Sequence, residues 1–259
     1  MSFSKKIGDL TEEIMEKVLM EQVRKDGGVP NHIGIITDGN RRFARENGMD
    51  PNTGHVRGKE KLEEVLEWSM EIGTKIVTVY AFSTENFHRN KDEVDFLLHL
   101  IDTSLRNLIT DERVIRNKIR VKVIGKLDIL PDYLCRTIED VERETRGYNE
   151  FRLNIAVGYG GREEIIDAIR KISKDYKEGM ITENEITEEN FRKYLYDGSI
   201  PDPDLILRTS GEERISNFLL WQGAYSELYF SDVYWPDLRK VDFLRAVRAY
   251  QTRQRRFGV

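Results

Sequence analysis

The sequence predicts an α/β fold, namely a single domain with a mostly parallel six-stranded sheet flanked by helices. Short, almost continuously apolar runs such as 76–82 are typical of parallel strands that are buried on both faces. Helical periodicity fills the stretches between these runs, so that strands and helices alternate along the chain. The 259 residues, of which 39% are hydrophobic and 34% charged, are enough for one large core.

The predicted strands are short and regularly spaced. They cover residues 33–36, 76–82, 119–124, 151–157, 204–208 and 228–230. Helices are expected at 54–73 and 94–109, and a basic helix starts near Lys240. The helix at 94–109 is apolar over a wider sector than one core face needs. In the helix after the fourth strand, four isoleucines are expected to face inward: Ile165, Ile166, Ile169 and Ile172.

The beginning of the chain predicts an amphipathic helix at 9–25, which ends at the Gly-Gly-Val-Pro segment 27–30. We expect residues 1–29 to form an N-terminal helical extension of a catalytic domain that spans 30–259. This helix either packs on the main domain or contacts a membrane surface or a partner. No internal repeat or linker divides the remaining sequence.

Charge and composition exclude several classes of protein. A net charge of −5 argues against a broad nucleic-acid-binding surface, so we expect no nucleic acid as a partner. The single Cys135 excludes an intramolecular disulfide framework and fits a reducing cytosol. The first residues lack the apolar core of a signal peptide, and no apolar run approaches the roughly 20 residues of a membrane span. We therefore expect a cytoplasmic protein, either soluble or peripheral at a membrane.

The segment 33–43 contains the most informative pattern. An apolar strand stops there and is followed by the run Asp38, Gly39, Asn40, Arg41 and Arg42. A strand, a tight turn and a helix start place backbone N–H groups beside two guanidinium groups and one carboxylate. N–H groups and arginines bind a multiply charged anion, and a carboxylate can hold a divalent cation. The segment therefore predicts a magnesium-diphosphate site.

Polar residues also follow the other predicted strands. Ligands of open α/β sheets bind at the carboxyl ends of the strands, so these residues are candidates for the same site. They are Ser83, Glu85, Asn86 and Arg89 after the second strand, Tyr159, Gly160, Gly161 and Arg162 after the fourth, and Arg208, Thr209, Ser210, Gly211, Arg214 and Ser216 after the fifth. Several arginines with glycines beside them argue for a site that binds more than one phosphate group.

Two further residues are interpreted through their context. His55 lies at a predicted helix start, where a lone histidine is usually structural, but the nearby Asp38 loop makes it a candidate diphosphate ligand. Glu227 lies in an aromatic, β-forming stretch, where burying an unpaired carboxylate is costly. Either a metal ion or an arginine partner would offset that cost.

Other phosphate-handling classes lack their motifs in this sequence. There is no Gly-x-x-x-x-Gly-Lys-Ser/Thr motif, which argues against a P-loop NTPase, and no Gly-x-Gly-x-x-Gly follows a strand. An aspartyl-phosphate phosphatase would need an aspartate two residues before Asp38, where Ile36 stands. No serine elbow or His/Cys metal cluster is present.

Several segments together resemble the cis-prenyltransferases of the undecaprenyl diphosphate synthase family. The resemblance covers nearly everything from His32 to Gly258 and rests on the segments 32–44, 54–55, 80–89, 159–163, 208–222 and 225–236. The N-terminal helix and Arg41 are more similar to archaeal and eukaryotic members than to most bacterial ones. The resemblance implies a homodimer with an apolar tunnel, which condenses isopentenyl diphosphate with an allylic diphosphate in the presence of Mg²⁺ and forms cis double bonds.

The resemblance also implies roles for single residues. Asp38 and Glu227 would bind the metal. Other residues would hold the allylic diphosphate, namely Gly39, Asn40, Arg42 and His55, with Arg41 beside them. Arg208, Arg214 and Ser216 would hold isopentenyl diphosphate. The reacting centre would be lined by Phe43, Phe82, Ser83, Asn86 and Arg89, with Glu93 in the adjoining loop. Proton loss would go to a diphosphate oxygen or through a relay that involves Asn40 or Asn86. Arg255 and Gly258 match a C-terminal motif that reaches the partner subunit's site.

Three positions depart from the family pattern. Pro51 stands where many members carry an arginine, Gly158 replaces the usual asparagine, and Phe43 replaces a common tryptophan. Three functions stay open at this point. The first is an active enzyme that makes a polyprenyl diphosphate, the precursor of a lipid glycosyl carrier. The second is an enzyme that joins its units in a non-head-to-tail manner, and the third is a non-catalytic partner subunit. An enzyme is favoured by the retained site residues, namely Asp38, Arg42, Arg208, Arg214 and Glu227.

Overall fold

The fold is that of the predicted α/β class, as the computed structural model of the chain shows. The structure describes residues 3–253, with side chains from residue 12 onward. Six strands are hydrogen-bonded in the order β3-β4-β2-β1-β5-β6. The chain divides into two compact units. The first comprises Met1–Val77, Asp204–Glu213 and Glu227–Val259, and the second comprises Thr78–Pro203 and Arg214–Ser226.

The first unit is built on three parallel strands. Its elements are α1 (Phe3–Asp26), β1 (His32–Ile36), α2 (Asn40–Glu46), α3 (Pro51–Ile72), β5 (Leu205–Arg208), β6 (Glu227–Phe230), the 3-10 turn η4 (Trp235–Asp237) and α9 (Lys240–Thr252). Strand β5 pairs in parallel with both β1 and β6. Every residue of β1 is buried, as expected of a parallel strand covered on both faces.

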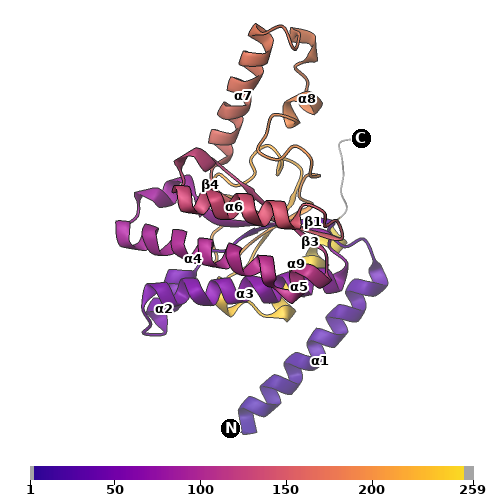
Figure 1. The fold of residues 1–259 in the computed structure, drawn as a ribbon. Coiled ribbons are helices and arrows are strands. Elements are labelled where there is room, and N and C mark those ends of the chain that lie inside the picture. The colour runs from indigo at the N-terminus through magenta and orange to yellow at the C-terminus, as the bar shows by residue number, and fades with distance from the viewer. Residues whose placement is uncertain (1–2, 254–259) are drawn as a thin grey trace. The chain divides into compact units, whose positions relative to one another are not determined.

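The second unit contains the remaining elements. They are η1 (Thr84–His88), α4 (Lys91–Thr110), α5 (Glu112–Arg116), β3 (Ile119–Ile124), η2 (Leu127–Ile129), α6 (Asp132–Thr145), β4 (Phe151–Tyr159), α7 (Gly161–Lys177), η3 (Glu183–Glu185) and α8 (Glu188–Arg192). Strand β2 (Ile76–Ser83) begins in the first unit and continues in the second. Strands β3 and β4 pair in parallel, and α6 packs on β3 and on α4 (Figure 1).

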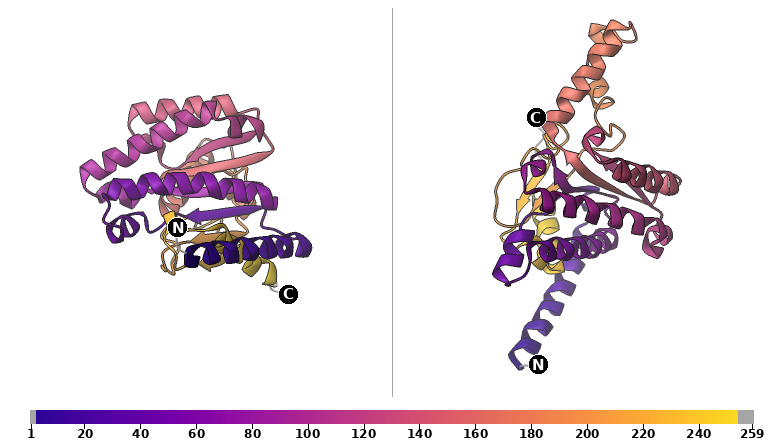
Figure 2. Two further views of the ribbon diagram at one scale, coloured as in Figure 1. Left: turned by 90° about the horizontal axis from the view of Figure 1, so that it is seen from below. Right: turned by 60° about the vertical axis from the view of Figure 1, so that its left-hand side comes forward.

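Helix α1 packs along α9 within the first unit (Figure 2, left). Met20 and Val23 are buried, and Gln251 donates hydrogen bonds to the carbonyl oxygens of Val23 and Gly27. An ion pair between Lys240 and Glu16, at 2.8 Å, joins the same two helices. The helix begins at Phe3, earlier than its sequence periodicity indicated. The domain boundary near residue 29 stays a prediction, and none of the described helices is long and apolar enough to cross a bilayer.

One sequence expectation about α7 is wrong. Ile166 and Ile169 are 47% and 46% exposed, whereas the buried stripe of this helix runs through Gly161, Glu164, Ala168 and Ile172. The buried face therefore contains the carboxylate of Glu164, and Ile166 and Ile169 on the neighbouring face are exposed to solvent. Hydrophobic periodicity could not find this face, because a buried Glu reads as a surface residue unless its hydrogen-bond partners are known.

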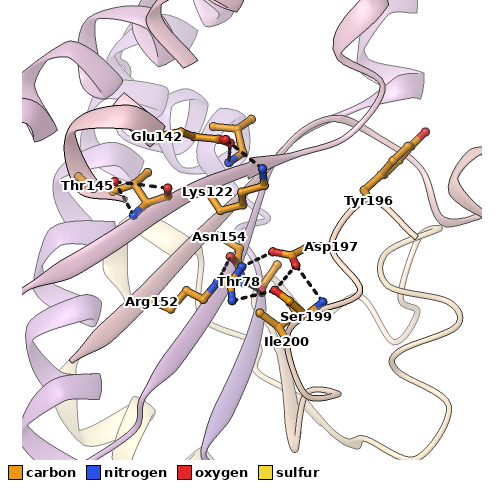
Figure 3. A network of polar contacts seen from close by, with 12 residues as sticks. Thr78, Lys122, Glu142, Thr145, Arg152, Asn154, Tyr196, Asp197, Ser199 and Ile200 are labelled. Atoms are coloured by element: carbon orange, nitrogen blue, oxygen red, sulfur yellow. Dashed lines mark hydrogen bonds and ion pairs between the residues drawn. The ribbon is translucent and has the colours of Figure 1, made fainter. Parts of the chain in front are cut away.

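A polar network ties the segment after α8 to the beginning of β4 (Figure 3). The half-buried Arg152 forms an ion pair with Asp197 and donates hydrogen bonds to Ser199 and Asn154. The fully buried Asn154 in turn donates to Thr78 Oγ1 at 3.0 Å. Burial lowers the pKa of Arg152, and the carboxylate of Asp197 offsets part of that effect. The network fixes strands β2 and β4 at their beginnings, away from the strand ends at which ligands bind in such folds.

We expect one buried carboxylate to make the stability of the second unit depend on pH. Asp102 on α4 accepts hydrogen bonds from Thr137 Oγ1 at 2.6 Å and from Arg106 Nε at 3.0 Å. Burial alone would raise the pKa of Asp102, but the hydrogen bonds from Arg106 and Thr137 lower it below its ordinary 3.8. A carboxyl with a lowered folded-state pKa stabilises the fold above its unfolded pKa, and this contribution is lost as the pH falls through the folded-state pKa.

Asp102→Asn should therefore lower the free energy of unfolding by about 1–3 kcal/mol at neutral pH, in the range of hydrogen bonds to charged groups. The loss should shrink toward zero as the pH falls through the lowered folded-state pKa of Asp102, where the wild-type carboxyl is itself protonated. Urea unfolding followed by circular dichroism at several pH values measures this difference. Asp95→Asn, an exposed position on the same helix, serves as the control and should change the free energy by less than about 0.5 kcal/mol. An equal loss at all pH values would contradict the prediction.

Candidate functional site

The carboxylate of Asp38 lies at the carboxyl end of β1, beside the end of β5. Strand register pairs Ile36 with Arg208, so the residue two places beyond β1 meets the last residue of β5. Arg208 Nη2 donates to Asp38 Oδ2 at 2.8 Å, and Arg42 Nη2 lies 3.5 Å from Oδ1. Arg208 is only 4% exposed, so this ion pair compensates a buried charge. The sequence-predicted cluster of Asp38, Arg42 and Arg208 is therefore present.

Two further side chains complete this Asp38 cluster. Thr209 Oγ1 accepts a hydrogen bond from the N–H of Asp38 at 3.1 Å and lies 2.7 Å from the Asp38 carbonyl oxygen. Glu212 Oε1 accepts from Arg42 Nη1 at 3.2 Å, so that Arg42 lies between two carboxylates. Sequence reasoning did not single out Glu212, although it lies within the 208–222 motif. The cluster thus has two arginines and two carboxylates at the ends of β1 and β5.

Close backbone approaches hold the turn that carries Asp38. Gly39 has a φ of 108°, and a Cβ at this position would lie 2.8 Å from the ring of Tyr234. On α3, a Cβ at Gly54 or Gly58 would overlap with Asn40, so both glycines allow α2 to touch α3. The Oδ1 atom of Asn40 is buried and makes no hydrogen bond within the described residues. These positions accept only glycine because a side chain would push the turn away.

The remaining predicted residues of the first unit flank this turn. His55 is buried in the first turns of α3, Arg41 is exposed on α2, and Phe43 is half-buried on the same helix. Pro51 is the first residue of α3, and Asp50 caps the helix by accepting from the N–H of Asn52 at 2.8 Å. Proline is favoured at this position, because its missing N–H needs no partner there.

Glu227 lies at the other end of the strands from Asp38. It is the first residue of β6 and pairs with Leu205, whereas Arg208 at the far end of β5 contacts Asp38. Three residues along a strand correspond to about 10 Å. The carboxylate of Glu227 instead forms an ion pair with Arg253 at 2.8 Å. Within this chain the structure does not bring Glu227 to Asp38, so a metal site shared by these two residues stays a prediction.

The second unit holds the predicted residues that follow β2. Ser83 and Asn86 form a reciprocal capping box around η1, in which the N–H of Ser83 donates to Asn86 Oδ1 at 3.0 Å. Phe82 is buried at the end of β2, with its ring edge-on to Phe87 at 4.9 Å between centroids. This turn therefore presents its polar side chains in one fixed arrangement.

The second unit also contains three more predicted site residues, namely Arg89, Arg214 and Ser216. Arg89 forms an ion pair with Glu93 at 2.8 Å. Arg214 and Ser216 are exposed, and Ser216 has a φ of 45°. Gly158 has a φ of 58°, a left-handed conformation that asparagine tolerates best after glycine. Arg255 and Gly258 lie outside the described residues.

A buried network lies behind the turn that follows β4. Glu164 accepts hydrogen bonds from Tyr159 Oη at 2.5 Å, Gln222 Nε2 at 3.0 Å and the N–H of Tyr196 at 3.0 Å. Burial raises the pKa of Glu164, and these hydrogen bonds offset part of the rise. Burial, together with the carboxylate of Glu164, raises the pKa of Tyr159. The network anchors the base of α7 to segment 214–226, and sequence patterns gave no signal for it.

The donor set of the Asp38 cluster suits a cation that is shared with a ligand. Among residues 12–253, no group of three or more His, Cys, Asp or Glu side chains is arranged to hold a metal ion. Magnesium in proteins is commonly bound by one or two carboxylates, with substrate phosphates and water as the other ligands. Asp38 Oδ1 is the less tightly held oxygen of its carboxylate, since Arg42 lies 3.5 Å from it whereas Arg208 lies 2.8 Å from Oδ2. The residues fit a magnesium ion that arrives with a diphosphate.

Comparisons with known proteins place the chain in a family. The family model described as "Putative undecaprenyl diphosphate synthase" matches residues 36–258. The tritrans,polycis-undecaprenyl-diphosphate synthase (geranylgeranyl-diphosphate specific) of Thermoplasma acidophilum is 64% identical over 258 residues, which cover all of both chains. The protein of the same name from Methanopyrus kandleri is 55% identical over 95% of this chain and 90% of its own.

Two solved structures also match this chain over most of its length. Lavandulyl diphosphate synthase from Lavandula x intermedia, in complex with dimethylallyl diphosphate, matches 89% of this chain and 99% of its own, with a TM-score of 0.83 and 34% identity. A probable undecaprenyl diphosphate synthase from Campylobacter jejuni matches 90% of this chain and 100% of its own, with a TM-score of 0.74 and 33% identity. The chain therefore belongs to the undecaprenyl diphosphate synthase family, the cis-prenyltransferases whose motifs its sequence carries.

Proposed function

We propose that this protein condenses isopentenyl diphosphate with geranylgeranyl diphosphate, in the presence of Mg²⁺, to form a tritrans,polycis-undecaprenyl diphosphate. The Asp38 cluster is the single observation that supports an active enzyme best, because it combines a buried arginine, a second arginine and two carboxylates at the strand ends. The primer and the product come from the names of relatives that are 64% and 55% identical over nearly the whole chain.

In this proposal the Asp38 cluster handles diphosphate. Diphosphate is a poor leaving group until its charge is neutralised. Arg42 would move from its two carboxylate partners to the phosphate oxygens, and Arg208 would keep the carboxylate of Asp38 oriented toward the cation. Magnesium, when bound, adds further neutralisation of the developing charge. Gly39 and Asn40 would shape the turn that faces the allylic diphosphate, with Arg41 and His55 beside it.

The reaction breaks the bond between the allylic carbon and its diphosphate oxygen, and the alkene of isopentenyl diphosphate forms the new carbon–carbon bond. A proton is then lost from the condensed product. A carboxamide is not basic at neutral pH, so we infer that a diphosphate oxygen accepts this proton. Asn86 and Ser83 would orient the reacting groups, with Phe82 as an apolar wall, and Arg214 and Ser216 would hold isopentenyl diphosphate.

The growing hydrocarbon needs an apolar environment, since each CH₂ that leaves water contributes about 0.8 kcal/mol. Helix α4 supports this part of the proposal. Five of its apolar side chains are only partly covered by the protein: Phe96, Leu100, Ile101, Leu108 and Ile109. We propose that an apolar tunnel along this helix receives the product chain. Assembly as a homodimer in the cytoplasm, with peripheral membrane contact because the product is a lipid, belongs to the same proposal.

The first experiment measures incorporation of radiolabelled isopentenyl diphosphate. With Mg²⁺ and geranylgeranyl diphosphate, we expect labelled polyprenyl diphosphate, and less product with dimethylallyl, geranyl or farnesyl diphosphate. Chromatography and NMR of the product give its chain length and double-bond geometry. A branched or cyclic product would support non-head-to-tail joining instead. An absence of incorporation with every primer would favour a non-catalytic partner subunit.

Asp38→Asn tests the Asp38 cluster. Asparagine keeps an oxygen that can accept from Arg208 but removes the charge that attracts the cation. We expect kcat/KM to fall at least about 100-fold, as when a group that stabilises transition-state charge is lost. Asp26→Asn, which removes the ion pair between Asp26 on α1 and Arg248 on α9, is the control and should stay within about twofold of wild type. Activity of Asp38→Asn close to that of the control would contradict the assigned role.

Removal of divalent cations should abolish incorporation and leave the fold intact. No cluster of metal-ligating side chains supports the fold in residues 12–253, so a chelator should not change the far-UV circular dichroism spectrum. Titration with MgCl₂ should restore the activity, because the cation is expected to enter with the diphosphate. Full activity in an excess of EDTA would rule out the magnesium requirement.

A further inference from the structure

Asn217 lies where three segments of the second unit meet. Its Nδ2 donates hydrogen bonds to Glu85 Oε1 and to Glu163 Oε2, both at 3.1 Å. Its Oδ1 accepts from the N–H of Arg162 at 2.9 Å, and its carbonyl oxygen accepts from the N–H of Gly161 at 2.7 Å. A single residue therefore joins η1, the beginning of α7 and the segment 214–226.

The backbone around Asn217 adopts a conformation that its surroundings must enforce. Ser216, Asn217 and Leu219 have φ values of 45°, 63° and 43°. Left-handed conformations of non-glycine residues persist only where packing and hydrogen bonds fix them, and asparagine tolerates them best. Phe218 supplies this packing, because its fully buried ring stacks on Tyr80 at 4.7 Å between centroids.

The turn after β4 leaves room for the Asn217 side chain. A Cβ at Gly160 would lie 2.8 Å from Asn217 Nδ2 and would also overlap with Glu163. The glycine is therefore needed for the close approach of the two segments. It follows that the Asn217 contacts depend on two separate sequence features, the glycine after β4 and the asparagine beyond the fifth strand.

Through Glu85, Asn217 acts on the turn that contains Ser83 and Asn86. Glu85 belongs to η1, whose N-terminal end is capped by the reciprocal hydrogen bonds of Ser83 and Asn86. Burial alone would raise the pKa of Glu85, but hydrogen bonds from its own N–H, from Ser83 and from Asn217 lower it. Glu85 therefore remains a carboxylate acceptor for Asn217 at neutral pH. The same residue that follows Ser216 in sequence thus holds the turn that carries Asn86.

We propose that Asn217 is a positioning residue, which holds the Ser83–Asn86 turn in its working geometry through Glu85. The proposal rests on the proposed function, in which Ser83 and Asn86 orient the reacting groups. Asn217 itself touches no reacting atom. Loss of the contact between Asn217 and Glu85 would slow the chemical step and leave the binding of isopentenyl diphosphate largely unchanged.

The test compares Asn217→Gly, Glu85→Ala, the double variant and Glu85→Gln. Glycine at position 217 removes the side chain but accepts the left-handed φ, so that backbone strain is not added. Glu85→Gln keeps an oxygen that can accept from Asn217. We expect Asn217→Gly and Glu85→Ala each to lower kcat about tenfold, as the loss of one hydrogen bond to a charged group would. The double variant should lose no more than Asn217→Gly alone, because that variant already breaks the contact with Glu85.

Glu85→Gln should keep kcat within about threefold of wild type. Glu85→Ala should leave the KM for isopentenyl diphosphate within about threefold of wild type, because the contact matters for the transition state and not for substrate binding. Additive losses in the double variant, a kcat of Asn217→Gly close to wild type, or a Glu85→Gln variant as slow as Glu85→Ala would overturn the proposal.

Hydrogen exchange separates this proposal from the proposed function. In Asn217→Gly, the amides of residues 84–89 should exchange faster, while those of β3 and α6 should keep their protection. If wild-type protein shows no incorporation, the proposed function fails, and faster exchange confined to residues 84–89 still supports the positioning contact. Unchanged exchange in that turn would overturn the positioning role whatever the activity.

Discussion

The parallel pairing of β5 with β1 is the constraint on which the candidate site depends. It places Arg208 level with Ile36, so that a guanidinium group from one strand end meets a carboxylate 170 residues earlier in the chain. Arg208 is almost fully buried, and an unpaired buried charge is strongly destabilising. The ion pair with Asp38 thus serves the fold and the chemistry together. A shift of one residue in this register would separate the two groups and turn their side chains to opposite faces.

Around both units, short polar side chains fix turns by bonding to backbone groups. Thr209 Oγ1 bonds to the N–H and to the carbonyl oxygen of Asp38, and Asn217 accepts from the N–H groups of Gly161 and Arg162 in the turn after β4. Glycines at 39 and 160 let these turns approach their neighbours closely. Turns held in this way lose little entropy when a ligand binds, which is the advantage of a preorganised site for charge stabilisation.

Much of the architecture could be predicted because strands buried on both faces have a simple sequence signature. The six strands, the turn at Asp38 and the parallel arrangement are examples. The buried face of α7 could not be predicted, because Glu164 lies in it and is satisfied by Tyr159, Gln222 and Tyr196, which are close only in the folded chain. The contact of Arg42 with Glu212 was missed for the same reason, since the two residues are 170 positions apart.

By itself, the sequence determined which chemical groups are available: a carboxylate and arginines after the first strand, arginines after the fifth, and a polar turn after the second. These are local patterns, and local patterns report secondary structure and composition. The tertiary structure alone decided which of these groups meet. It brought Asp38 to Arg208 through strand register, placed Glu227 at the opposite end of the same strands beside Arg253, and made Asn217 the link between Glu85 and the turn after β4. Register and hydrogen-bond partners depend on contacts between residues distant in sequence, so only the folded chain can specify them.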